Sequence, residues 1–85
     1  MSVHKEISQH SQEQHQRIQS FLELDAEREK WIEEALNQCK GGQPFEKALH
    51  HINGVTDDIN KIARKGIVPQ RKNVTSAMIE ALCNR

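Results

Sequence analysis

Apolar residues recur at steps of three and four along two stretches of the chain, the spacing that places them on one face of an α-helix. The first stretch indicates a helix over residues 3–40. Its apolar members from residue 18 onward are Ile18, Phe21, Leu22, Leu24, Trp31, Ile32, Ala35, Leu36 and Cys39. The second stretch predicts a helix over residues 45–65. Its apolar members are Phe45, Ala48, Leu49, Ile52, Val55, Ile59, Ile62 and Ala63.

Two glycines and a proline separate these helices. Gly41 and Gly42 are followed closely by Pro44. Glycine is favoured just after the last helical turn, and proline cannot continue a helix, so we expect a tight turn here. Within the second helix, Asn53-Gly54 is a weak point, because glycine costs about 1 kcal/mol relative to alanine. A kink, or two shorter helices meeting at this pair, is the alternative to a continuous helix.

A third, short helix is predicted near the end of the chain. Gly66 has the position of a glycine cap on the second helix, and Ile67 is placed to fold back onto its last turn. Pro69 then prevents helical continuation. Thr75 is a favourable N-cap for a helix that ends near Cys83.

The predicted fold is all-α, with three helices that are long, medium and short in chain order. The first two form an antiparallel hairpin because their connection is short. At 1.5 Å per residue, the second helix covers ~30 Å and lines only the C-terminal half of the first. We expect one domain over residues 1–85, with the short C-terminal helix across the open end of the hairpin.

The segment over residues 1–17 is the part of the first helix that the hairpin leaves uncovered. Residues 8–17 are almost wholly polar. One interpretation is a solvated extension of the helix. The other is a helical arm that contacts a second copy of the chain, in the manner of a coiled coil, through Val3, Ile7 and Ile18.

Charge divides the chain into two halves although the formal net charge is zero. Residues 1–42 carry a net charge of −3, and residues 43–85 carry +3. Two halves of opposite charge favour association between copies of the chain, and they fit binding of an anionic ligand equally well. No apolar run is long enough to cross a membrane, and the first residues lack a secretory pattern. We therefore expect a cytoplasmic protein with free thiols and no membrane contact.

Residue spacing gives no support to catalysis or to metal and cofactor binding. The histidines are His4, His10, His15, His50 and His51. None of them has the three- or four-residue spacing that places two ligands on one helical face. Cys39 and Cys83 lie near helix C-termini, where the dipole disfavours a thiolate, and the predicted layout keeps them apart. Acidic residues over 23–34 form a solvated face, so we expect no enzyme, no metal and no cofactor.

One segment is strongly basic. Its cationic residues are Lys61, Arg64, Lys65, Arg71 and Lys72. A helix, a glycine-containing turn and a capped helix over residues 61–82 outline a helix-turn-helix, which would place these cations on nucleic-acid phosphates. The following helix offers no Arg, Lys, Asn or Gln to read bases, however. A structural role, in which the basic segment meets the acidic face of the first helix, is the other interpretation.

Three sequence segments resemble a family of short proteins from Bacillus-type bacteria that is known only as a domain of unknown function. They are Met1-Ser2-Val3-His4-Lys5-Glu6-Ile7, Leu24-Asp25-Ala26-x-Arg28-Glu29 and Lys65-Gly66-Ile67-Val68-Pro69-x-Arg71-Lys72-x-Val74-Thr75. The resemblance covers essentially the whole chain. It implies a bacterial, cytoplasmic protein and brings no activity, ligand or catalytic residue.

The sequence therefore favours a non-enzymatic helical interaction protein that self-associates, as a dimer, with a further protein partner left open. The alternative is a nucleic-acid-binding accessory protein that uses the basic segment.

Overall fold

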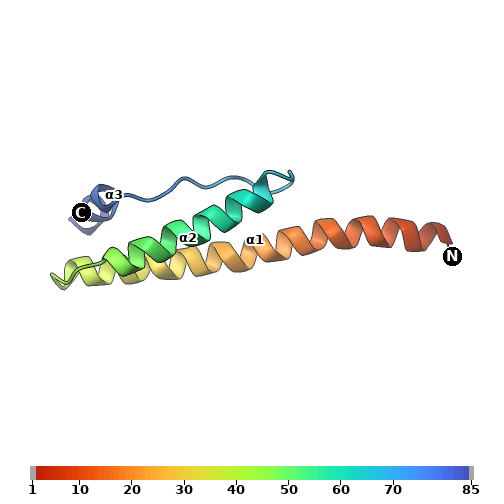
Figure 1. Cartoon of the computed structure of the whole chain (residues 1–85). Helices are drawn as coiled ribbons and strands as arrows, with labels where there is room; N and C mark the ends of the chain where they lie inside the picture. Colours follow the sequence, from red (N-terminus) through yellow and green to blue (C-terminus); the bar gives the residue numbers. More distant parts are fainter. Residues whose placement is uncertain (1, 85) are drawn as a thin grey trace.

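The computed structural model describes the backbone of residues 2–84 and the side chains of residues 12–84. The chain forms α1 (Ser2–Lys40), α2 (Glu46–Ala63) and α3 (Ser76–Cys83), and the described residues contain no strand. The all-α class and the long, medium and short order are thus confirmed. The molecule is elongated, measuring 61 × 21 × 18 Å, because α1 runs its full length (Figure 1).

A glycine turn folds α2 back antiparallel to α1. Gly42 has a φ of 70°, a left-handed conformation that glycine adopts without steric cost. The Gln43 N–H donates to the Gln38 carbonyl at 2.8 Å, which satisfies a carbonyl of the last turn of α1. The α2 helix is continuous through Asn53-Gly54. The tight turn and the continuous helix both agree with the sequence.

The core lies between the two long helices in two clusters. Near the turn, the buried residues are Ala35, Ala48, Ile52 and Ile79. Farther from the turn they are Phe21, Val55 and Ile59. Trp31 of α1 stacks on His51 of α2 with ring centroids 4.2 Å apart. Since Ile79 belongs to α3, the short helix completes the core at the turn end of the hairpin.

The prediction that α3 lies across the open end of the hairpin is therefore wrong. After α2, Gly66 and Ile67 both have positive φ, and the chain reverses direction. Residues 67–75, which we term the strap, then run back beside α2 to α3 (Figure 1). Nine residues can reach at most ~30 Å, and the 18 residues of α2 rise ~27 Å, so the strap is long enough to return the chain to the α1–α2 turn.

Of the two local predictions for residues at the ends of the strap, one is confirmed and one is wrong. Thr75 caps α3 as predicted, its hydroxyl accepting from the Met78 N–H at 3.3 Å. Ile67, expected to fold onto α2, is instead 52% exposed. Val68 packs against the second core cluster in its place. The reason is that Ile67, with a φ of 80°, is part of the chain reversal itself, so the next residue is the one that reaches the core.

Candidate interaction surface

Two asparagines of α2 bind the strap to the hairpin. The Asn60 side chain accepts from the Arg71 N–H at 2.8 Å and donates to the Arg71 carbonyl at 2.9 Å. Asn53 makes the same pair of bonds to Val74, at 2.7 and 2.9 Å. From Asn53 to Asn60 the helix rises ~10 Å over seven residues. From Arg71 to Val74 the extended chain advances the same distance over three residues, so the two asparagines and their two partners are equally spaced. This pairing was not predicted from the sequence, where its signal is an Asn at each end of a two-turn interval of the helix.

Arg28 joins all three parts of the hairpin and strap. Its Nε donates to the Thr56 hydroxyl at 2.9 Å, and its Nη2 donates to the Lys72 carbonyl at 2.9 Å. The buried Thr56 hydroxyl in turn donates to the Ile52 carbonyl at 2.7 Å. No role was predicted for Arg28 from the sequence, although its position on the α1 face that packs on α2 was an available signal.

The basic segment also contacts the acidic face of α1. Arg71 forms an ion pair with Asp25 at 3.1 Å, and its guanidinium lies 5.3 Å from the centre of the Phe21 ring. This contact supports the structural interpretation of the segment. Lys61, on exposed α2 surface, lies 3.8 Å from Asp58. The extended strap also separates α2 from α3, so the segment does not have the tight turn of a helix-turn-helix.

The remaining predicted cations stay on the surface. The exposed residues are Lys61, Arg64, Lys65 and Lys72, whereas Arg71 is half-buried. The segment therefore places four of its five cations in solvent.

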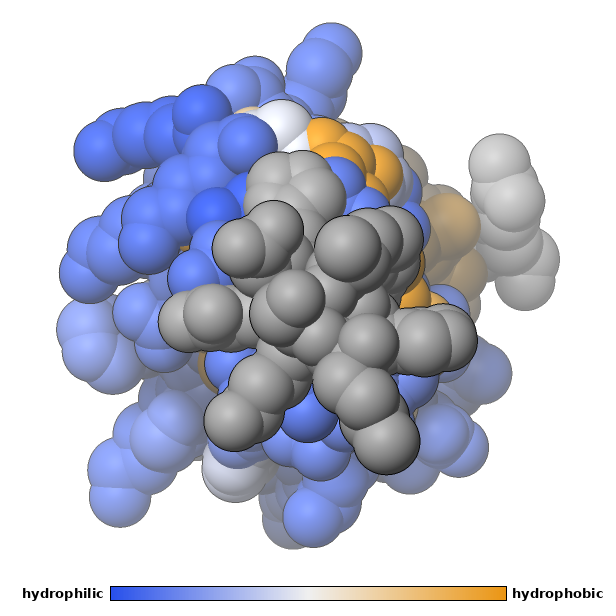
Figure 2. Space-filling view, turned by 90° about the vertical axis from the view of Figure 1, so that its right-hand side faces the viewer, coloured by the Kyte–Doolittle hydropathy of each residue, from blue (hydrophilic) through white to orange (hydrophobic). Residues whose placement is uncertain are grey.

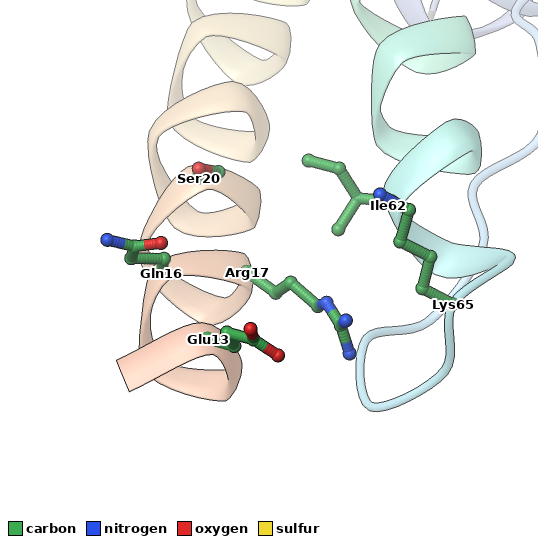
Figure 3. Close-up of a pocket in the computed structure, with 6 residues that line it drawn as sticks. All are labelled: Glu13, Gln16, Arg17, Ser20, Ile62 and Lys65. Carbon is green, nitrogen blue, oxygen red and sulfur yellow. The ribbon is translucent and has the colours of Figure 1, made fainter. Parts of the chain in front are cut away.

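A shallow groove of about 380 Å³ lies where α1 passes the end of α2 (Figure 3). Glu13, Gln16, Arg17 and Ser20 line it from α1, with Ile62 of α2 and Lys65 of the following turn on the other side. Arg17 extends across the gap toward the α2 side. An adjoining hollow of about 390 Å³ shares Ser20 and Ile62 and is otherwise mainly acidic. The mixed charges and open shape describe a surface between diverging helices.

Beyond this groove the backbone of α1 continues past the end of α2 (Figure 1). Ile18 and Leu22, one turn apart on α1, are 39% and 58% exposed. Seen from the end where α1 begins, the described surface is mostly hydrophilic with a hydrophobic area on one side (Figure 2). The side chains of Val3 and Ile7, the other residues predicted for self-association, lie outside the described ones.

The two cysteines come together, contrary to the sequence prediction. The Cys39 and Cys83 thiols are close enough to share a hydrogen bond, because the strap carries α3 back to the end of α1. This hydrogen bond, burial and the negative charges of Cys83 and Glu80 raise the pKa of Cys39 to about 11. Both thiols are free and half-buried.

Among the described residues, no three His, Cys, Asp or Glu side chains gather as a metal site. No described helix has an apolar stretch of the length and hydropathy that a membrane span needs.

The fold and surface thus define a small all-α protein, a helical hairpin closed by a strap. The chain belongs to the family described as "Protein of unknown function (DUF2533)", whose model matches residues 1–85. It is 41% identical over 83 residues to the "Uncharacterized protein YpbS" of Bacillus subtilis (strain 168). The aligned stretch covers 98% of this chain and 95% of that protein. The resemblance to a Bacillus-type family of unknown function is confirmed. No solved structure matches the chain.

Proposed function

We propose that this protein is a non-enzymatic helical interaction protein that self-associates as a homodimer through the N-terminal half of α1. The observation that carries the proposal is the continuation of α1 past α2, with Ile18 and Leu22 exposed beside it. Apolar side chains on a helical face gain free energy when a second helix removes them from water. A second copy of the chain offers the same face, as a twofold interface requires.

The register of the apolar residues favours an antiparallel pair. Ile7 and Ile18 are equally far from a point between residues 12 and 13, and so are Val3 and Leu22. A twofold axis at that point sets Ile7 of one copy opposite Ile18 of the other. Positions 3, 7, 18 and 22 also fall within a sector of about 100° on an ideal helix. These four positions therefore share one face of an ideal helix, and the same face on a second, antiparallel copy is complementary to it.

Sedimentation equilibrium of the wild type and two matched variants tests the dimer. We expect a reversible monomer–dimer equilibrium between micromolar and millimolar concentrations. Leu22→Glu should shift it toward monomer, because it places a carboxylate opposite an apolar residue. Leu82→Glu, the same change at a 43% exposed position on α3, should leave it unchanged. A monomeric wild type throughout, or equal effects of the two variants, contradicts the proposal.

Nucleic-acid binding through the basic segment is the alternative, and it predicts a different result. Retention on heparin or mixed DNA at low salt, abolished by changing the exposed Lys72 and the half-buried Arg71, would support it. The interaction-protein proposal expects passage without retention at the same salt concentration.

A further inference from the structure

Two pairs of residues, each one helical turn apart, bring the cysteines together. On α1, Cys39 follows Ala35 by four residues, and on α3, Cys83 follows Ile79 by four. Ala35 and Ile79 are fully buried in the same core cluster, against which Cys39 also packs. Residues four apart lie on one helical face, so each cysteine lies on the face of its helix that joins this cluster, and the two thiols are close enough to share a hydrogen bond. The cysteines therefore meet across the α1–α3 interface although 44 residues separate them in the chain.

We propose that Cys39 and Cys83 form a reversible disulfide on exposure to a hydroperoxide, and that this bond latches α3 onto the end of α1. In the first step, the Cys83 thiolate attacks the outer oxygen of the hydroperoxide. The O–O bond breaks, the rest of the hydroperoxide takes from solvent a proton equal to the one that Cys83 released, it leaves as an alcohol, or as water from hydrogen peroxide, and Cys83 becomes a sulfenic acid.

In the second step, the Cys39 sulfur attacks the Cys83 sulfur. The S–S bond forms, the S–O bond breaks, and the departing hydroxide takes the Cys39 proton and leaves as water. One hydroperoxide is thus reduced for each pair of thiols oxidised, and a thiol reductant reverses the bond.

The order of the two steps follows from the surroundings of Cys39. Its pKa is raised to about 11, chiefly by the hydrogen bond with Cys83, so Cys39 stays protonated at neutral pH. Since the thiolate is the nucleophile, Cys39 is a poor first attacker of the oxidant, and we assign it to the second step.

The bond would close a loop that contains α2 and the strap. A crosslink between residues 39 and 83 removes conformations from the unfolded chain but leaves the packed α3 in place. The latched molecule should therefore resist unfolding, and the strap should be held at both ends: at α2 through Gly66 and at α1 through α3.

Hydrogen peroxide treatment of the dilute protein, followed by alkylation and mass spectrometry, tests the proposal. We expect the intact mass of one chain less two hydrogens, no alkylated cysteine, and a disulfide joining tryptic peptides 31–40 and 73–85. The rate should not depend on protein concentration, which separates this bond from one between dimer partners. A thiol reductant should restore both thiols.

Two variants and a thermal measurement complete the test. Cys39→Ser should leave Cys83 as a sulfenic acid trapped by dimedone, and Cys83→Ser should react more slowly than the wild type.

Oxidation should raise the wild-type Tm by roughly 10 °C or more, and should not change that of the Cys39→Ser, Cys83→Ser double variant. Two alkylated thiols after oxidation, chiefly interchain disulfides, or an unchanged Tm would overturn the proposal.

Discussion

Arg28 is the residue at which α1, α2 and the strap meet. It bonds the Thr56 hydroxyl and the Lys72 carbonyl, and hydrogen bonds from a charged donor stabilise a fold by about 1.5–3 kcal/mol. Asp25, three residues earlier, holds Arg71 of the strap at 3.1 Å. Two of the segments that carry the family resemblance, around residues 24–29 and 65–75, are thus in contact with each other.

Replacing Arg28 by methionine should lower the free energy of unfolding by about 2 kcal/mol, because two charge-assisted bonds are lost and the Lys72 carbonyl loses its donor. Urea denaturation followed by far-ultraviolet circular dichroism measures this change. Lys30→Met is the matched control: Lys30 is exposed, and its replacement should cost under about 0.5 kcal/mol. Equal effects of the two substitutions would show that the Arg28 bonds contribute nothing.

Residue types predicted the ends of the helices well and the contacts between them poorly. Gly42 and Thr75 act through their own backbone and nearest neighbours, so their roles in the turn and the α3 cap are local and readable. The roles of Arg28 and Asn53 depend on partners 44 and 21 residues away. The register of Arg28 places it on the face of α1 that packs on α2, but nothing near it in sequence identifies those partners.

At the scale of elements, the strap decides the fold. Pro69 correctly indicated non-helical chain, but the length and direction of that chain decide at which end α3 packs. The nine residues of the strap are long enough to span α2, and this length brings Ile79 into the core cluster of Ala35 and Cys83 to Cys39. A connection read from sequence as a turn puts α3 at the open end of the hairpin and keeps the cysteines apart, and both predictions were wrong for this reason.

Asn60→Ala should release the middle of the strap while leaving the hairpin folded. The Arg71 amide loses its acceptor, so its hydrogen exchange should quicken roughly tenfold, which corresponds to about 1.4 kcal/mol of local stability. Native-state exchange followed by NMR measures this. Amides in the middle of α1 should keep their protection, and Asn37→Ala, at an exposed position of α1, should change neither. Unchanged exchange at Arg71 would contradict the assignment of Asn60 as the anchor of the strap.

At the scale of the whole molecule, α1 is too long for α2 to cover. The helix has 39 residues and α2 has 18, and the groove beside Arg17 and Lys65 marks where they part. The sequence anticipated this mismatch because helix length can be read from periodicity and stop signals. Ile18 was predicted for self-association and is exposed, and Leu22 extends its stripe by one turn.

The distance between spin labels on two copies of the chain tests the antiparallel dimer most directly. With both native cysteines changed to serine, a label would be placed at Gln12 or at Glu23, both exposed. The proposed axis predicts an axial offset of ~2 Å between Gln12 labels and ~32 Å between Glu23 labels, so the Glu23 distance should be clearly longer. Equal distances at the two sites, or no dipolar coupling between chains at millimolar concentration, would contradict the dimer.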